Sequence, residues 1–563
     1  MSENADKAKH DATGGETAGE RSAEPGTGAG TGTSGVGTSG GDTSGAGAPG
    51  AGASGAGQAQ AAAAARAQAS LARRVRSAPP APIRTATLVA VLVAGLATAV
   101  FLGDGVGPGL LLAALPAMAA AYVAARAAGR TVRPWTVVWS LGCVALLVVP
   151  ALRDSAWPST LAVLAAVFLA ALALQGTRRW PGVLLAPLGL VDTAVTGVGW
   201  AWEGVRSRGG GVDRTRWLPI AKATVVAVVL LFVFGALFAS ADAAFADLLG
   251  GLTPDVSVGE SPFRVALFLV GALCALSVAR TAAAPLRWDR VATTPGKPRS
   301  RVEWALPLVV LNLLFAGFIA VQLAVLFGGY DEVLDRTGLT YAEYARQGFW
   351  QLLWATVFVL AVIALALRWA PRGGAGDRRF VRVVLGTLCL LTLVVVASAV
   401  RRMDLYVDAY GLTRLRLSVV TMELWLGLVI VLLMAAGVFG GRWLARAVAG
   451  SAAATVLAFG LMSPDGIIAE TNVARYTSDD KIDVEYFRHL SADAAPALDR
   501  LPEPQRSCAL IGVRDDLAES KGAPWFATSL AQSRARRILD ARPVTATAHD
   551  CVRLGLYGGR SEY

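Results

Sequence analysis

The sequence contains a series of long apolar runs, which constrain the fold more than any other feature. From residue 85 onward we count eleven runs of about 17 to 25 residues, the length that an α-helix needs to cross roughly 30 Å of hydrocarbon. The predicted spans are residues 85–103, 107–125, 134–152, 157–175, 217–239, 262–282, 303–328, 348–369, 380–400, 417–439 and 443–463. The sequence therefore predicts an all-α protein, a polytopic transmembrane helix bundle.

The composition agrees with a membrane protein and argues against a nucleic-acid partner. Hydrophobic residues make up 54% of the chain and charged residues only 17%, and the formal net charge is +11. The arginines stand in short clusters between apolar runs, as in cytoplasmic loops, rather than on one basic segment. We therefore expect the protein to interact with the lipid bilayer and not with a nucleic acid.

Three regions follow from the change in composition along the chain. Residues 1–80 are rich in Gly, Ala, Ser and Thr and are expected to be a disordered tail, because they cannot bury enough apolar surface to offset their ordering entropy. Residues 81–463 form the predicted transmembrane domain. Residues 464–563 are polar and evenly charged, and they predict a small, mainly helical domain.

The distribution of basic residues predicts the orientation. Arginines at 73, 74, 76 and 84 precede the first span, so the N-terminus is expected in the cytoplasm. An odd number of spans then places residues 464–563 outside the cytoplasm. Residues 180–202 are the ambiguous segment: they are long enough to span but carry Asp192 and two prolines, and we interpret them as re-entrant or interfacial. Counting them as a span would invert every later loop.

The sequence offers little support for an enzyme. It has three histidines, His10 in the tail and His489 and His549 near the C-terminus, which disfavours imidazole metal sites and a Ser-His-Asp triad within the membrane. Walker A, HExxH and CxxC patterns are absent. We therefore predict no catalytic residue, no cofactor-binding residue and no metal ligand.

Polar residues at membrane depth are the first group of candidate site residues, because burying them there is costly. Asp192 and Lys222 are expected near the cytoplasmic face, either paired or separately solvated. Asn312 and Gln322 share one span and either hydrogen-bond between helices or line a substrate path. Glu423 is expected near Arg402 and Arg416, as a packing ion pair or as a proton or ligand site.

Two external stretches form the second group. Thr340 and Glu343 make a capping box, which predicts a helix that carries Arg346 outward before it enters the eighth span. Residues 401–416 have the pattern of an amphipathic helix lying at the outer surface. The alternative is that both stretches form a recognition surface for a protein partner.

Cysteines in the C-terminal region suggest a covalent link. Cys508 and Cys551 both lie in the polar segment after the last span, and they are a candidate disulfide if that segment faces an oxidising compartment.

Four ordered motifs resemble a known family. They are FASADAAFADLL (residues 238–249), TYAEYARQGFWQLL (340–353), RMDLYVDAYGLTRLR (402–416) and NVARY with KIDVEYFRHLSADAAPAL (472–498). Together they are similar to the bacterial membrane-protein family of domain of unknown function 4153, in an older split 4173. The resemblance implies a multi-span protein of the bacterial cytoplasmic membrane, without an established activity or cofactor. It supplies no catalytic residues.

Three classes of function remain compatible with the sequence. A non-enzymatic sensor or scaffold is the leading hypothesis, since polar detail gathers at the predicted outer face. A small-molecule or ion transporter is the alternative, although the single ambiguous segment at 180–202 has no counterpart in the other half. A lipid-linked transferase is the third, with the acidic residues 242–260 as its one candidate site.

Overall fold

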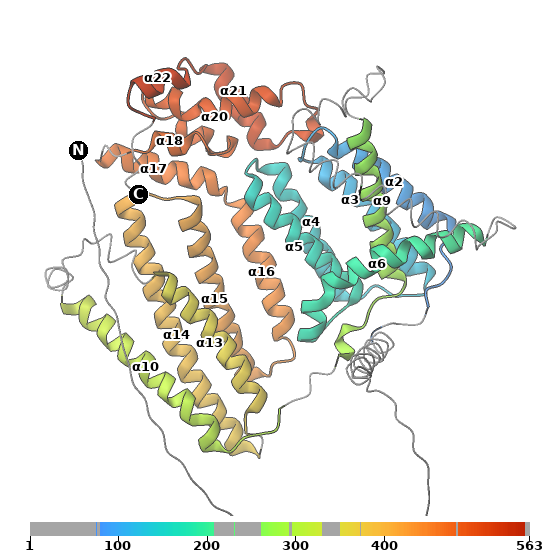
Figure 1. Cartoon of the computed structure of the whole chain (residues 1–563), viewed down its shortest axis with the longest axis vertical. Helices are drawn as coiled ribbons and strands as arrows, with labels where there is room; N and C mark the ends of the chain where they lie inside the picture. The colour runs from blue at the N-terminus through green and yellow to red at the C-terminus, as the bar shows by residue number, and fades with distance from the viewer. Residues whose placement is uncertain are drawn as a thin grey trace, which may run out of the picture. The chain divides into compact units, whose positions relative to one another are not determined.

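The computed structural model describes residues 79–207, 261–291, 296–328, 349–371, 373–479 and 482–557, together with Val75 and Leu230. Every regular element in these ranges is a helix (Figure 1). The long helices are α2 (Thr85–Leu102), α3 (Gly109–Ala127), α4 (Pro134–Leu152), α5 (Ala156–Gln175), α6 (Trp180–Arg206), α9 (Ser261–Ala283), α10 (Arg301–Gly328), α13 (Phe349–Trp369), α14 (Ala375–Tyr410), α15 (Arg414–Phe439) and α16 (Leu444–Leu461). The all-α prediction is confirmed.

These 11 helices, of those the structure describes, are long and apolar enough to cross a membrane. Ten of them coincide with predicted spans. The remaining one is α6, whereas the predicted span 217–239 lies outside the described residues apart from Leu230. The chain is therefore a multi-pass membrane protein.

The spanning helices form two groups. In the first, α2 packs against α3 and α9, and α4 packs against α5. In the second, α14 packs against α10, α13 and α15. Helix α16 lies between the groups, since it contacts α4 and α5 on one side and α15 on the other (Figure 1). Small residues allow this close approach: a Cβ at Gly460 of α16 would lie 2.7 Å from a methyl carbon of Val149.

The spanning helices other than α6 alternate in direction from one to the next along the chain, except that α5 and α9 run in the same direction, so their ends gather at two ends of the bundle. We call the end where α2 begins the basic end. The last residues of α3, α5 and α9 also lie at this end. The start of α16 lies there too, because Arg446 Nε donates to the carbonyl of Thr177 at 3.1 Å. The opposite end carries the C-terminal domain, and we call it the capped end.

Helix α6 has both of its ends at the basic end. Near its start, Gly182 packs against Asp289, which follows α9, and against Thr177, which follows α5. Near its end, Trp200 Nε1 donates to the carbonyl of Ala81 at 2.9 Å, just before α2 begins. In the middle, the Thr193 hydroxyl lies 2.7 Å from that of Thr281, in the last turn of α9. Helix α6 thus crosses the ends of its neighbours instead of running alongside them.

The segment around residues 401–416 differs from its prediction. Helix α14 continues without a break through Tyr410 for 36 residues, so residues 401–410 are its last turns and not a separate surface helix. The helix ends where Gly411 takes a positive φ of 78°. A hydrogen bond from the Leu412 N–H to Asn472 Oδ1, 2.9 Å long, then ties the turn to the C-terminal domain. The predicted capping box at Thr340 and the outward helix with Arg346 lie outside the described residues.

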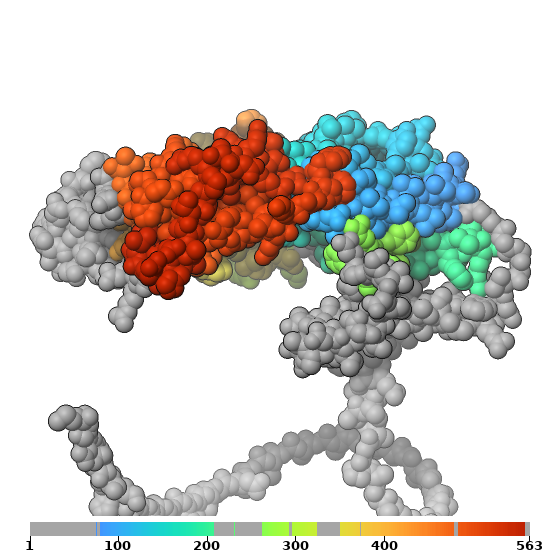
Figure 2. Space-filling model, turned by 90° about the horizontal axis from the view of Figure 1, so that it is seen from above, coloured from blue at the N-terminus to red at the C-terminus, as the bar shows by residue number. Residues whose placement is uncertain are grey.

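The C-terminal domain begins at Pro464 and consists of short helices. They are α17 (Pro464–Asp479), α18 (Val484–Phe487), η2 (Ala492–Ala494), α19 (Ala495–Leu498), α20 (Gln505–Glu519), η3 (Trp525–Ala527), α21 (Leu530–Ala541) and α22 (Ala548–Arg553). Its core buries Phe487, Leu490 and Leu498 and reaches Leu412 in the α14–α15 turn. Figure 2 shows this domain in orange and red beside the blue residues of α2 and α3. An edge-to-face contact between Phe101 and Phe526 joins the two.

A buried polar cluster fastens this domain to the capped end. Asp465 is fully buried and accepts hydrogen bonds from the Ser155 hydroxyl at 2.7 Å and from Arg414 Nε and Nη2 at 2.8 and 2.6 Å. Asp493 accepts from the backbone N–H groups of Asp154 and Ser155 at 2.7 and 3.2 Å. These five residues are the docking network. They join the α4–α5 loop, the start of α15 and the C-terminal domain.

Candidate anion-binding site

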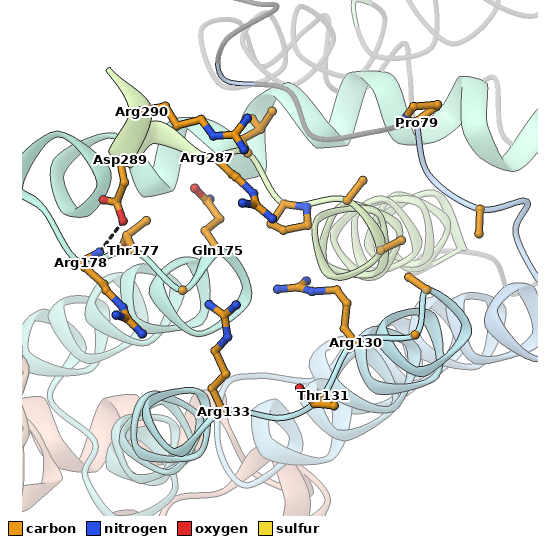
Figure 3. A pocket seen from close by; sticks show the side chains of 18 of the residues that line it. Pro79, Arg130, Thr131, Arg133, Gln175, Thr177, Arg178, Arg287, Asp289 and Arg290 are labelled. Carbon is orange, nitrogen blue, oxygen red and sulfur yellow. Dashed lines mark hydrogen bonds between the residues drawn. The ribbon is translucent and has the colours of Figure 1, made fainter. Parts of the chain in front are cut away.

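Six arginines surround a cavity of about 1070 Å³ at the basic end. They come from three separate loops: Arg130 and Arg133 from the α3–α4 loop, Arg178 and Arg179 from the α5–α6 loop, and Arg287 and Arg290 from the segment after α9 that contains η1 (Trp288–Arg290). In Figure 3 the side chains of Arg130, Arg133 and Arg287 point toward a common centre.

Glycine-dependent helix ends form two of these loops. Helix α3 ends in a Schellman motif, with Gly129 at φ +67°, the Arg130 N–H bonded to the Ala125 carbonyl and the Gly129 N–H bonded to the Arg126 carbonyl. Helix α5 ends at Gly176, whose φ is +66°. The two turns bring the loops together, because a Cβ at Gly176 would lie 3.4 Å from Arg133 Nη1.

Arg130 is bonded to backbone carbonyls rather than to a carboxylate. Its Nη1 donates to the carbonyl of Ala282 at the end of α9, and its Nη2 donates to that of Leu174 at the end of α5, at 3.2 Å. Cations are favoured at such helix C-termini, where unpaired carbonyls gather. Burial lowers the pKa of Arg130, and the positive charges of Arg133 and Arg287 lower it further. The cavity is therefore a region of positive potential.

One acidic residue, Asp289, is among the described residues that line the cavity, and its single negative charge does not balance six arginines. Its Oδ2 accepts from the Arg178 backbone N–H at 2.8 Å and its Oδ1 from the Arg179 backbone N–H at 3.0 Å. Asp289 thus satisfies two amides at the start of α6. Among the described residues, the lining of the cavity has six guanidinium groups and one carboxylate.

The other five arginines have exposed side chains. Within the described ranges their guanidinium groups have neither a hydrogen bond nor an ion pair; they are Arg133, Arg178, Arg179, Arg287 and Arg290. Guanidinium groups bind phosphate and carboxylate oxygens in a bidentate manner, so a cluster of them is suited to a multivalent anion.

Two buried polar side chains also line the cavity. Gln175 is 7% exposed and Thr177 is 3% exposed. Gln175 Nε2 donates to the Ala186 carbonyl at 2.6 Å, whereas Gln175 Oε1 and Thr177 Oγ1 have no hydrogen-bond partner in the part of the chain that the structure describes. Buried polar atoms without a partner are rare, and here they add hydrogen-bonding capacity to the cationic wall.

Most of the residues singled out from the sequence lie elsewhere. Asp192 is half-buried on α6, and its carbonyl accepts from the Thr196 hydroxyl at 2.9 Å. Its proposed partner Lys222 lies outside the described residues. Asn312 and Gln322 both face α14: Asn312 Nδ2 donates to the Val384 carbonyl at 3.3 Å, and Gln322 Oε1 accepts from Ser398 at 3.2 Å. These contacts connect α10 to α14.

The three charged residues expected to meet around Glu423 have separate partners. Arg402 Nη2 donates to Gln322 Oε1 at 3.0 Å. Arg416 lies 4.2 Å from the centre of the Tyr406 ring and donates to the carbonyls of Tyr410 and Gly411. Glu423 is fully buried, and its Oε1 accepts from the Thr356 hydroxyl at 3.2 Å.

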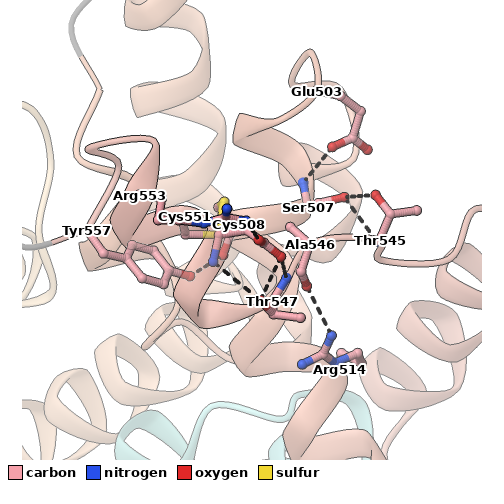
Figure 4. Close-up of a disulfide and its surroundings, with 11 residues drawn as sticks. Glu503, Ser507, Cys508, Arg514, Thr545, Ala546, Thr547, Cys551, Arg553 and Tyr557 are labelled. Carbon is pink, nitrogen blue, oxygen red and sulfur yellow. Dashed lines mark hydrogen bonds and ion pairs between the residues drawn. A yellow bond between two sulfur atoms is a disulfide. The ribbon is translucent and has the colours of Figure 1, made fainter.

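Cys508 and Cys551 form a disulfide in the C-terminal domain (Figure 4). It joins α20 to α22 across 43 residues of sequence. The Tyr557 hydroxyl donates to the Cys508 carbonyl beside it.

Sequence reasoning used the cavity arginines only as a signal of orientation. They stand in three loops separated by as many as 160 residues, and each loop alone has the composition of an ordinary cytoplasmic loop. The signal available in the sequence was that arginines cluster between apolar runs, as in cytoplasmic loops. No cluster of three or more His, Cys, Asp or Glu suited to a metal ion occurs among the described residues.

The fold and this site define a class: a multi-pass helical membrane protein with a cationic cavity at one end of its bundle and a small domain at the other. Residues 141–501 match a family described as a domain of unknown function, DUF4153, and since this is more than half of the chain, the protein belongs to that family. The resemblance seen in the sequence is thereby confirmed. Neither the curated proteins nor the solved structures include a match.

Proposed function

We propose that this protein is a sensor or scaffold of the bacterial cytoplasmic membrane that binds phosphate-bearing anions in its arginine-lined cavity. The observation that carries the proposal is the set of five exposed guanidinium groups around one cavity that have no partner among the residues described by the structure. Like charges held close together repel one another, and an anion relieves that repulsion. Phosphate supplies the oxygen geometry that arginine pairs with best.

The proposed orientation places the cavity in the cytoplasm. Arginines crowd the basic end, in agreement with the excess of basic residues in cytoplasmic loops. The C-terminal domain lies at the opposite end, and a disulfide such as Cys508–Cys551 persists in oxidising compartments outside the cytoplasm. In this proposal the cavity binds an anion on the cytoplasmic side and the C-terminal domain binds a protein partner on the outer side. The helix bundle connects these two sites across the membrane.

We further propose that α6 lies in the membrane interface and does not cross. Its two ends contact the same end of the bundle, and Trp180, Trp200 and Trp202 suit an interfacial depth. Its outward face has an apolar stripe at helical spacing, formed by Leu184, Leu188, Val191 and Val195. Ser207 and Ser261 then lie at opposite ends, and the apolar run 217–239 is available between them.

Calorimetric titration of the purified full chain with glycerol phosphate tests anion binding. Replacing Arg178 and Arg287 together by Gln should weaken binding about tenfold or more, since two charge-assisted contacts are lost. The matched control replaces Arg378 and Arg379, exposed arginines on α14 that do not line the cavity, and should bind like the parent. No binding by the parent, or equal weakening in both variants, would contradict the proposal.

Reporter fusions test the topology. Fusions after Gly210, Asp335 and Arg500 should report cytoplasm, exterior and exterior in that order. An exterior signal at 210 would show that α6 crosses, and a cytoplasmic signal at 500 would overturn the orientation.

Transport is a second candidate function, favoured by Glu423. This carboxyl is fully buried on α15, and its Oε2 has no hydrogen-bond partner among the described residues. Intramembrane acids of this kind carry protons in transporters. Glu423→Gln keeps the acceptor for Thr356, so it should preserve folding while abolishing a pH-dependent phenotype of the parent. An unchanged phenotype would remove this candidate.

A further inference from the structure

An apolar groove adjoins the arginine-lined cavity. It has a volume of about 350 Å³ and lies between α3 and α4, with α5 and α9 as its floor. Its mouth is lined by exposed apolar side chains: Tyr122 on α3, Val132 in the loop, and Val137 and Leu141 on α4. Small residues, Ala121, Ala170 and Ala173, keep its interior open.

The groove and the cavity share a wall. Arg130 and Thr131 line both. On α5 the groove ends at Leu174 and the cavity begins at Gln175. Arg130 lies between the two spaces, held by its hydrogen bonds to the Leu174 and Ala282 carbonyls. A molecule in the groove therefore has its polar end beside the guanidinium cluster.

The depth of the groove fits one leaflet of a bilayer. Its lining runs from Arg126 to Met118 on α3 and from Thr136 to Val144 on α4, which at 1.5 Å per residue is about 12 Å along the helices. One leaflet contributes about 15 Å of hydrocarbon. The polar boundary of that leaflet would then coincide with Arg130.

From this arrangement we infer that the ligand of the cavity is an anionic phospholipid, with its phosphate among the arginines and one acyl chain in the groove. The inference rests on the proposed anion binding and names its ligand class. The excess of six arginines over one aspartate is complementary to a phosphate ester, and the apolar groove is complementary to a chain. A free anion would use the arginines alone and a neutral apolar molecule would use the groove alone. A phospholipid uses both of these adjoining spaces.

Native mass spectrometry of the full chain in a neutral detergent measures lipid binding. We expect phosphatidylglycerol to bind about tenfold or more tightly than phosphatidylcholine, which carries no net charge. We also expect it to bind more tightly than glycerol phosphate, because each buried CH₂ raises affinity about fourfold. Arg178→Gln combined with Arg287→Gln should weaken the binding of both anions.

A groove-filling variant separates this inference from anion binding itself. Val137→Trp, at the mouth of the groove, should weaken phosphatidylglycerol binding about fivefold or more and leave glycerol phosphate binding unchanged. Leu115→Trp on α3, equally exposed but outside the groove, is the matched control and should change neither.

The outcomes are distinct. If glycerol phosphate binds as tightly as phosphatidylglycerol, or if Val137→Trp has no effect on the lipid, the lipid inference is wrong while anion binding stands. If the parent binds neither ligand, both proposals fail. If phosphatidylcholine binds as tightly as phosphatidylglycerol, the groove binds acyl chains but the arginines do not select the headgroup. The lipid inference would then be wrong as well.

Discussion

The two ends of the bundle use the same residue types in opposite ways. At the capped end, the docking network places the partly exposed Arg414 against the fully buried Asp465 in a bidentate pair with N–O distances of 2.8 and 2.6 Å. At the basic end, five arginines stand around an open cavity without partners among the described residues, and Asp289 is occupied by backbone amides.

This difference separates a structural site from a binding site. The lone pairs of Asp465 are already satisfied by Arg414, Ser155 and the Ser491 N–H, so nothing remains to bind a ligand. The cavity arginines retain their donors. Removing Asp465 or Arg414 should therefore cost stability, and removing a cavity arginine should cost affinity.

Asp465→Asn should have the largest effect on stability. It removes the charge of a fully buried carboxylate that accepts four hydrogen bonds, and the loss of charge-assisted bonds worth about 1.5–3 kcal/mol each puts the cost at about 3–5 kcal/mol. Thermal unfolding in detergent and limited proteolysis of the C-terminal domain would measure the loss. Asp404→Asn is the control, because the Arg401–Asp404 pair is also within 2.9 Å but about 60% exposed and should contribute less than about 1 kcal/mol. Equal effects would mean that the docking network is not structural.

Removal of the disulfide should have the next largest effect. Replacing Cys508 and Cys551 by Ser frees a loop of 43 residues and should destabilise the C-terminal domain by about 2–4 kcal/mol. Reductant should have the same effect on the parent. Glycerol phosphate affinity should stay unchanged, since the bond belongs to the domain at the capped end. Lost affinity at the cavity would show that the two ends are coupled.

Asp154→Asn should have a smaller effect that depends on pH. Burial raises the pKa of Asp154, and the carboxylate of Asp493 raises it further, although a hydrogen bond from the Ala492 N–H opposes this. A raised folded pKa gives stability that is present below the unfolded pKa of about 4 and is lost as pH rises through the folded pKa.

Asn imitates the protonated acid and still accepts from Ala492. The variant should therefore be more stable than the parent at pH 7 and equal to it below about pH 4. Unfolding temperatures at the two pH values measure this difference. A variant that is less stable at pH 7 would mean that the network needs the charge of Asp154.

The sequence predicted the helices well and the sites poorly, for physical reasons. Apolar length alone identifies a span, so nine spans were placed within a few residues, whereas α14 continues ten residues beyond its predicted end. Apolar length cannot reveal that both ends of α6 lie at the same end of the bundle. That arrangement depends on the contacts of Gly182 and Gly204, which are tertiary. The 401–416 segment was misassigned because its charged stripe resembles a surface helix, whereas α14 continues through it.

The C-terminal region shows the same limit. Composition predicted a mainly helical region there but not the bounds of its helices: α21 begins at Leu530, where Ser529 and Gln532 form a capping box after the short helix η3. In the docking network Ser155 pairs with Asp465, which is 310 residues away in the sequence. No local sequence pattern predicts such a pairing. The cavity likewise depends on three loops that meet only after folding.

Arg287→Gln should have the smallest effect on stability and is the sharpest test of the contrast between the ends. Arg287 is exposed, its guanidinium has no partner among the described residues, and its charge is one of those that lower the pKa of Arg130. Its loss should leave the free energy of unfolding within about 0.5 kcal/mol of that of the parent. We expect a small gain in stability, because the repulsion between the remaining arginines falls. The same variant should bind glycerol phosphate several-fold more weakly. If it instead unfolds more easily by more than about 1 kcal/mol and binds normally, the arginines at the basic end serve the fold as the docking network does, and the distinction between the two ends disappears.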